Sequence, residues 1–202
     1  GTESIVEEIT MDDLKSYYNS YLTPTLSTMH VVGDISQYSV TQSLTQMQAN
    51  WEAKDVQIPD FDNPIAPDKS TVYFYDVPNA SQSVLRFGYP ALKYTDEEYY
   101  DATVMNYILG GGGFASRLTQ QLRETKGYTY GIRSGFSGGK RDGLFTISSG
   151  VRSNVTFEAT QLVKDILDDY PDTFSDQDLE TTKSFLIKSG ARAFETAGAQ
   201  LN

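Results

Sequence analysis

Residues 107–131 read YILGGGGFASRLTQQLRETKGYTYG. Four consecutive glycines separate an apolar segment from a polar, helix-like one: Gly110, Gly111, Gly112 and Gly113. The apolar spacing before them predicts a helix that ends at Gly110. Ser116 predicts the start of a second helix, which runs to Lys126 and is ended by Gly127. The stretch therefore predicts two helices joined by a glycine-rich connection.

The glycine run does not have the spacing of a nucleotide-binding loop. A phosphate-binding loop of the GxxxxGK[ST] type needs a lysine followed by serine or threonine, and none follows here. A dinucleotide fingerprint can be placed on Gly110, Gly112 and Ala115, but it requires a preceding strand where this sequence predicts a helix. One glycine is enough to join two helices. We therefore expect the run of four to form a loop that moves, or one that another chain approaches closely.

The residues that flank this stretch predict an α+β fold, a mostly antiparallel sheet covered by helices. Strands are expected at TVYFYDV (71–77), at SVLRFGYPAL (83–92), and in a hairpin of residues 128–136 and 144–151 with the loop SGGKRDG. Thr95 and Glu98 predict the start of the helix before the glycines. A strongly amphipathic helix follows the hairpin, with Val155, Ala159, Leu162, Val163, Ile166 and Leu167 on its apolar face. The chain is again helical from Asp176 onward.

The N-terminal part has a different organisation. Thr10 and Asp13 predict a helix start, and a tyrosine-rich helix then extends to Pro24. A short strand, MHVVGDI (29–35), and a second helix ending near Trp51 complete an α–β–α unit. Prolines and acidic residues in 52–70 predict a linker. We thus expect three regions: residues 1–51, a linker at 52–70, and a second domain at 71–202.

Composition excludes several kinds of protein and site. The formal net charge of −11 excludes a nucleic-acid partner, because phosphate binding needs a cationic face. No apolar run approaches the roughly 20 residues of a membrane span. The chain has no cysteine and one histidine, His30, which we interpret as a hydrogen-bonded strand residue. These residues cannot supply a usual zinc site, so no metal ligand and no catalytic residue is expected in this chain.

Arg123 and Tyr130 are the candidate binding residues. They lie on either side of Gly127, and a bend there can bring a guanidinium and a phenol toward one point. Both groups donate hydrogen bonds to a carbonyl or carboxylate. Residue types alone leave a second interpretation open, a surface arginine and a half-buried strand tyrosine.

The same stretch resembles the second-domain signature of the zinc peptidase family that includes pitrilysin, insulin-degrading enzyme and the mitochondrial processing peptidase. Its matching elements are the glycine loop, Ser116-Arg117-Leu118, Leu122-Arg123-Glu124 and the Gly-x-x-Tyr of residues 127–130. The flanks also match, so the resemblance covers about residues 10–188. It implies the processing-peptidase, or LuxS-like metallohydrolase, fold.

The resemblance further implies a function. In that family Arg123 and Tyr130 correspond to a substrate-binding pair, and the zinc-binding His-x-x-Glu-His helix lies on a preceding domain, which this sequence lacks. The chain would then be a fragment that binds peptide substrate and closes a chamber with a zinc-bearing domain or subunit, using Gly110–Gly113 for close approach. The alternative is a non-catalytic scaffold or partner subunit of the same fold. We expect a bacterial periplasmic location, with the cytoplasm as the alternative.

The family comparison also implies an open sheet edge. Residues 10–51 resemble the tail of the first domain, and the second domain's own tail would lie beyond Asn202. A sheet with an open edge accepts a substitute strand. We therefore expect residues 29–32 to dock on the sheet of residues 70–202, within one chain or swapped between two.

Overall fold

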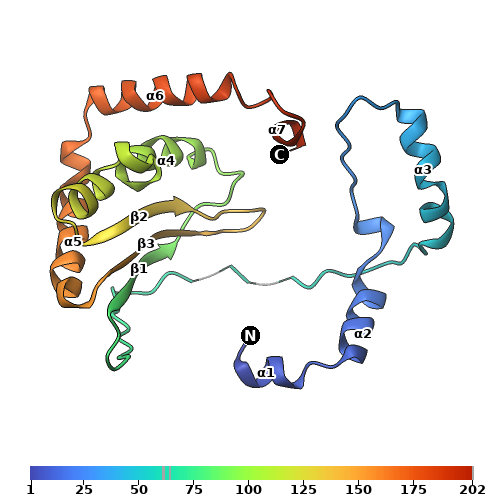
Figure 1. Ribbon diagram of the computed structural model, residues 1–202, viewed down its shortest axis with the longest axis horizontal. Helices are drawn as coiled ribbons and strands as arrows, with labels where there is room; N and C mark the ends of the chain where they lie inside the picture. The colour runs from blue at the N-terminus through green and yellow to red at the C-terminus, as the bar shows by residue number, and fades with distance from the viewer. Residues whose placement is uncertain (61, 64, 202) are drawn as a thin grey trace. The chain divides into compact units, whose positions relative to one another are not determined.

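The computed structural model describes residues 1–60, 62–63 and 65–201. The chain forms two compact units, one made of Gly1–Phe61 with Gly190–Asn202 and the other of Asp62–Ser189 (Figure 1). No described helix is both long and apolar enough to cross a membrane.

The first unit is helical. Its elements are α1 (Glu3–Glu8), α2 (Met11–Tyr21), η1 (Pro24–Leu26), α3 (Gln37–Asn50) and α7 (Ala197–Leu201). The start of α2 is confirmed, because Thr10 and Asp13 each bond the other's backbone N–H in a capping box. The buried Thr23 hydroxyl accepts the N–H of Lys54 at 2.9 Å and so ties the linker to the end of α2. This contact orders the start of the predicted linker.

The strand predicted at residues 29–35 is wrong, because this segment adopts neither helix nor strand. A strand needs a neighbour for its N–H and C=O groups, and no described segment pairs with this one. His30, assigned to that strand, is instead exposed.

The second unit contains the sheet, as the predicted α+β class requires. Its strands are β1 (Gln82–Pro90), β2 (Thr129–Phe136) and β3 (Leu144–Arg152). All pairs are antiparallel and the spatial order is β1-β3-β2, so β3 lies in the centre. The β2–β3 hairpin and its loop are confirmed.

The strand predicted at residues 71–77 is also wrong. The segment is exposed and unpaired, with Tyr73 91% and Phe74 82% exposed. Its aromatic and β-branched composition favours a strand. Composition provides no ladder partner, however, and the described sheet holds only three strands.

Helices cover one face of the sheet. They are α4 (Tyr99–Asn106), η2 (Tyr107–Gly111), η3 (Gly113–Ala115), η4 (Thr119–Thr125), η5 (Ser153–Val155), α5 (Thr156–Thr173) and α6 (Asp176–Gly190). The predicted cap of α4 is wrong, because Glu98 occupies the N-cap position without a side-chain capping hydrogen bond and Thr95 lies outside the helix start. Asp96 instead accepts the N–H of Lys93 and forms a turn, so the helix begins at Tyr99.

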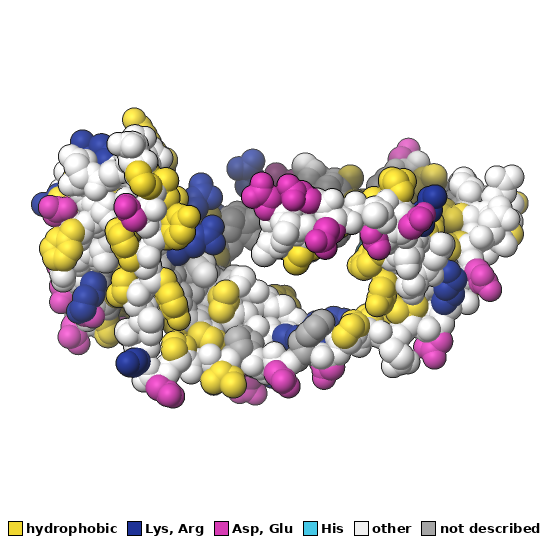
Figure 2. Space-filling view, turned by 90° about the horizontal axis from the view of Figure 1, so that it is seen from below, with side chains coloured by type: hydrophobic (Ala, Val, Ile, Leu, Met, Phe, Trp, Pro, Cys, Tyr) yellow, Lys and Arg dark blue, Asp and Glu magenta, His cyan; other side chains and the backbone are white. Residues whose placement is uncertain are grey.

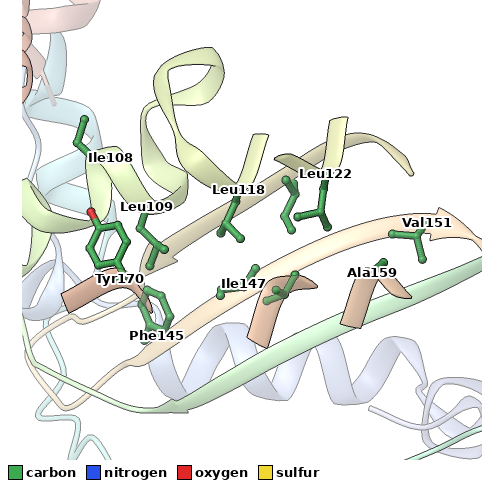
Figure 3. Packing of buried hydrophobic residues seen from close by; sticks show 11 residues of the cluster. Ile108, Leu109, Leu118, Leu122, Phe145, Ile147, Val151, Ala159 and Tyr170 are labelled. Carbon is green, nitrogen blue, oxygen red and sulfur yellow. The ribbon is translucent and has the colours of Figure 1, made fainter. Parts of the chain in front are cut away.

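The core lies between these helices and the sheet. Leu118 and Leu122 are directed toward the central strand β3, which carries Ile147 and Val151 (Figure 3). From α5, Ala159 and Val163 pack into the same cluster, as its predicted apolar face requires. The opposite face of the sheet stays exposed: Val84 on β1 is 73% accessible.

Docking of residues 29–32 onto the sheet, expected within one chain or swapped between two, stays a prediction. These residues form no strand, and the sheet's three strands all come from the second unit. The apolar faces of the N-terminal helices remain exposed, with Leu14 at 55% and Tyr17 at 62%. Exposed hydrophobic side chains are visible as yellow surface in Figure 2.

Candidate functional site

Arg123 lies in the last turn of η4. Its guanidinium lies over the ring of Phe114, 4.6 Å from the ring centre, and its Nε is 3.5 Å from the carboxylate of Glu124. The Arg123 side chain is 38% exposed. The aromatic ring therefore supports one face of the guanidinium, while donor groups stay accessible to a ligand.

Tyr130 lies at the start of β2, in a β-bulge. Thr129 pairs with Val151 and Ile132 with Ser149, so two residues of β2, Tyr130 and Gly131, oppose Gly150 alone. The extra residue lets Thr129 and Ile132 both face the core. Tyr130 is 90% exposed, so the half-buried interpretation of this residue is wrong.

A buried pair of hydroxyl groups holds the bulge. The hydroxyl of Thr129 accepts the N–H of Gly131 at 3.0 Å and donates to the carbonyl of Gly150 at 2.7 Å. The hydroxyl of Ser149 donates to the carbonyl of Gly131 at 3.0 Å. Side chains thus bond both backbone groups of Gly131, where the regular ladder is interrupted. The sequence analysis missed this network, because a bulge gives no clear signal in a strand pattern.

A tight connection joins the two candidate residues. Gly127 has a φ of +61°, and its N–H bonds the carbonyl of Arg123 at 3.1 Å. The N–H of Tyr128 bonds the carbonyl of Leu122 at 2.8 Å, so β2 begins directly at the end of η4. In the described part of the chain, no hydrogen bond or ion pair joins Arg123 to Tyr130. The structure places both on one connection, each accessible by itself.

Two of the four glycines are required for different physical reasons: one for close packing and one for its backbone conformation. A Cβ on Gly110 would lie 2.3 Å from the Ser134 hydroxyl and 2.8 Å from Leu118, so η2 can approach β2 only without a side chain. Gly113 has a φ of +58°, which other residues rarely adopt, and faces open space. The predicted helix end at Gly110 is displaced, since η2 continues to Gly111. A role of the run in substrate approach stays a prediction.

Arg117 anchors this region to the end of the fold. Its guanidinium lies 2.7 Å from the carboxylate of Asp178, bonds the hydroxyl and carbonyl of Thr173, and lies over the Tyr170 ring. Burial alone would raise the pKa of Asp178, but hydrogen bonds from Ser175 and the charge of Arg117 hold that pKa below its ordinary value. This arginine is structural, and its partners lie more than fifty residues away along the chain.

Burial raises the pKa of Tyr170 to about 12, while the nearby Arg117 charge opposes the shift. The phenol therefore stays protonated and donates to the carbonyl of Met105 at 2.8 Å. This bond connects α5 to α4.

The donor set does not fit a zinc ion. Among the described residues, no three His, Cys, Asp or Glu side chains gather in an arrangement that could hold a metal. His30, the single histidine, is exposed in the other unit.

Comparison with known protein families shows to which family this chain belongs. The sequence matches the peptidase M16 inactive domain over residues 8–186. The chain belongs to this family. The predicted kinship with the pitrilysin group is therefore confirmed, and the matched range includes both Arg123 and Tyr130.

Individual relatives agree with the M16 assignment. The chain is 27% identical over 207 residues to uncharacterized zinc protease YmxG of Bacillus subtilis, covering 100% of this chain and 48% of the relative. It is 26% identical to the non-peptidase homolog YmxG of Helicobacter pylori, covering 100% and 46%. The chain thus spans about half the length of these relatives.

A solved M16 structure has the same fold. The crystal structure of the peptidase M16 inactive domain from Pseudomonas fluorescens superposes with a TM-score of 0.80 at 27% identity. The match covers 93% of this chain and 45% of that one. The three-stranded antiparallel sheet with its helices is therefore an M16 inactive-domain arrangement.

Proposed function

We propose that this chain is the substrate-holding part of a zinc-dependent peptidase unit, in which another M16 domain or subunit carries the metal site. The observation that carries the proposal is the presentation of Tyr130, a phenol 90% exposed on a bulge that buried hydroxyls hold in place. Other tyrosines of the chain are as exposed, Tyr73 among them, but Tyr130 lies on a bulge that the buried hydroxyls of Thr129 and Ser149 hold in place, as a recognition group requires.

The two candidate residues offer complementary donors. The phenol of Tyr130 donates one hydrogen bond, and the planar guanidinium of Arg123 donates several. Both suit a peptide carbonyl, and a charge-assisted bond strengthens as negative charge develops on that oxygen. Arg123 and Tyr130 would therefore hold the substrate backbone and stabilise the developing oxyanion.

The metal would have to lie elsewhere, because the donor set here does not fit one. Relatives about twice as long as this chain are named zinc proteases, which is consistent with a second domain that binds zinc. Bond cleavage would then belong to that domain, and this chain would contribute binding and closure of the chamber.

A non-catalytic scaffold is the second candidate. One relative is named a non-peptidase homolog, and a chain of the Candida albicans complex III2 shares the fold at a TM-score of 0.66 and 13% identity. A scaffold needs no accessible donor pair, so the exposure of Arg123 and Tyr130 favours the substrate-holding role.

The test measures cleavage of a fluorogenic peptide by the whole enzyme that contains this chain. Arg123→Ala should lower kcat/KM by about 10- to 150-fold, the scale of a lost charge-assisted hydrogen bond. Tyr130→Phe should lower it less, and neither variant should change the zinc content.

Arg192→Ala and Tyr100→Phe are matched controls, because both residues are exposed outside the candidate site. Unchanged kinetics in both site variants, or no cleavage by an enzyme shown to hold zinc, would support the scaffold role.

A further inference from the structure

The exposed face of the sheet has an unusual charge. The three strands contain three arginines, Arg86, Arg133 and Arg152, and no aspartate or glutamate. The whole chain has 27 acidic and 16 basic residues. All three arginines are exposed, and none has a carboxylate within ion-pair distance among the described residues. The face is therefore cationic within an acidic protein.

The register aligns two of these arginines across the sheet. Arg86 on β1 and Arg133 on β2 both pair with Ser148 on the central strand β3. Adjacent strands lie about 4.8 Å apart, so the two arginine Cα atoms are roughly 10 Å apart with Ser148 between them. Two long side chains at this separation can both reach one carboxylate above the exposed serine.

Small residues occupy the centre of this face. On this face the central positions of β3 are Thr146, which is half-buried between Gly88 and Gly135, and Ser148 and Gly150, which are exposed. Next to Ser148 on this face of β3 is Gly150, and Tyr130 lies opposite Gly150 at the start of β2. A peptide lying along β3 would therefore contact Tyr130 and the two arginines together.

We propose that the open face of the sheet binds an extended acidic peptide segment, with an Asp or Glu side chain held between Arg86 and Arg133. The inference rests on the proposed substrate-holding function and gives it a specificity. Charge complementarity selects the ligand, since a guanidinium pair prefers a carboxylate to an amide. At about 0.15 M salt the Debye length is about 8 Å, so the local arginines outweigh acidic residues elsewhere on the chain.

The experiment compares two fluorescein-labelled peptides with blocked ends that differ in one central residue, Glu or Gln. Binding to the chain is read by fluorescence anisotropy. Wild type should bind the Glu peptide about tenfold more tightly than the Gln peptide. Arg86→Gln and Arg133→Gln should each reduce this preference to about threefold, and the double variant should abolish it.

Arg192→Gln is the matched control, because it removes the same charge from an exposed arginine outside the sheet. It should keep the tenfold preference, and circular dichroism should show that all variants stay folded. Equal binding of the two peptides by wild type, or an equal loss in Arg192→Gln, would overturn the inference while leaving the proposed function intact. Absence of binding to either peptide would overturn both.

Discussion

The guanidinium of Arg123 lies 4.6 Å from the centre of the Phe114 ring, so the glycine-rich loop and the end of η4 meet at the candidate site. The carbonyl of Phe114 also accepts a hydrogen bond from Gln120 at 2.6 Å. The loop therefore supports the arginine directly. This contact assigns the loop a positioning function that glycine flexibility alone does not indicate.

Phe114→Leu should weaken peptide binding about two- to fivefold, because an exposed cation–π contact contributes about 0.5–1 kcal/mol. Anisotropy with the fluorescent peptides measures the effect. Phe157→Leu, at a phenylalanine 75% exposed on α5, is the control and should bind as wild type does. Equal affinity of Phe114→Leu and wild type would show that the ring does not support Arg123.

Thr129→Val should change how Tyr130 is presented. Valine matches the shape of threonine but leaves the N–H of Gly131 and the carbonyl of Gly150 without that hydroxyl, at a cost of about 1–2 kcal/mol in unfolding free energy. Peptide affinity should fall as well, because the bulge would no longer hold Tyr130 in place. Thr129→Ser keeps the hydroxyl and should restore both stability and binding. If Thr129→Val lost stability but bound peptide as wild type does, the bulge would not contribute to peptide binding.

Gly110→Ala should destabilise the second unit by about 1–3 kcal/mol, since the new methyl group would overlap Ser134 and Leu118. Urea unfolding followed by circular dichroism measures the change. Gly139→Ala, where nothing lies within 4 Å of an added Cβ, should stay within about 0.5 kcal/mol of wild type. Similar effects of the two substitutions would argue against the close packing of η2 on β2.

Asp178→Asn should lower stability in a pH-dependent way. The pKa of Asp178 is held below its ordinary value, so its contribution is complete above the unfolded pKa of about 3.9 and is lost as pH falls through the folded pKa. The variant should lose about 1 kcal/mol at neutral pH and match wild type at about pH 2. Asp172→Asn, at an exposed position, is the control. If the unfolding free energy of the variant stayed below that of wild type at about pH 2, the cause would be lost packing rather than lost charge.

The isolated chain should hold far less than one zinc ion, because its single histidine is exposed and no described cluster of donors exists. Elemental analysis after gel filtration measures the content. One tightly held zinc per chain would contradict the donor analysis.

Much of the fold was predictable from local patterns. The capping box of Thr10 and Asp13, the helix end at Gly127 and the amphipathic face of α5 are each defined within a few residues. The β2–β3 hairpin was predictable for the same reason, since a seven-residue loop joins strands that pair with each other. The resemblance carried by residues 107–131 then predicted the family.

The two wrong strands show the limit of this reasoning. Residues 29–35 and 71–77 have the composition of strands, but a strand exists only where another segment takes its hydrogen bonds. Composition is a property of the segment, and pairing is a property of the whole chain.

The sequence by itself named Arg123 and Tyr130 as candidates, through their residue types on either side of Gly127 and through the resemblance of residues 107–131 to a known family. Only the tertiary structure decided how these two residues are held. The Phe114 ring lies against the guanidinium of Arg123, and the hydroxyls of Thr129 and Ser149 hold the bulge that carries Tyr130. The tertiary structure also decided the alignment of Arg86 with Arg133 across the sheet. Each of these relationships joins different elements of the fold. They depend on strand register and helix packing, which arise from the summed burial of the core and are encoded in no single stretch of sequence.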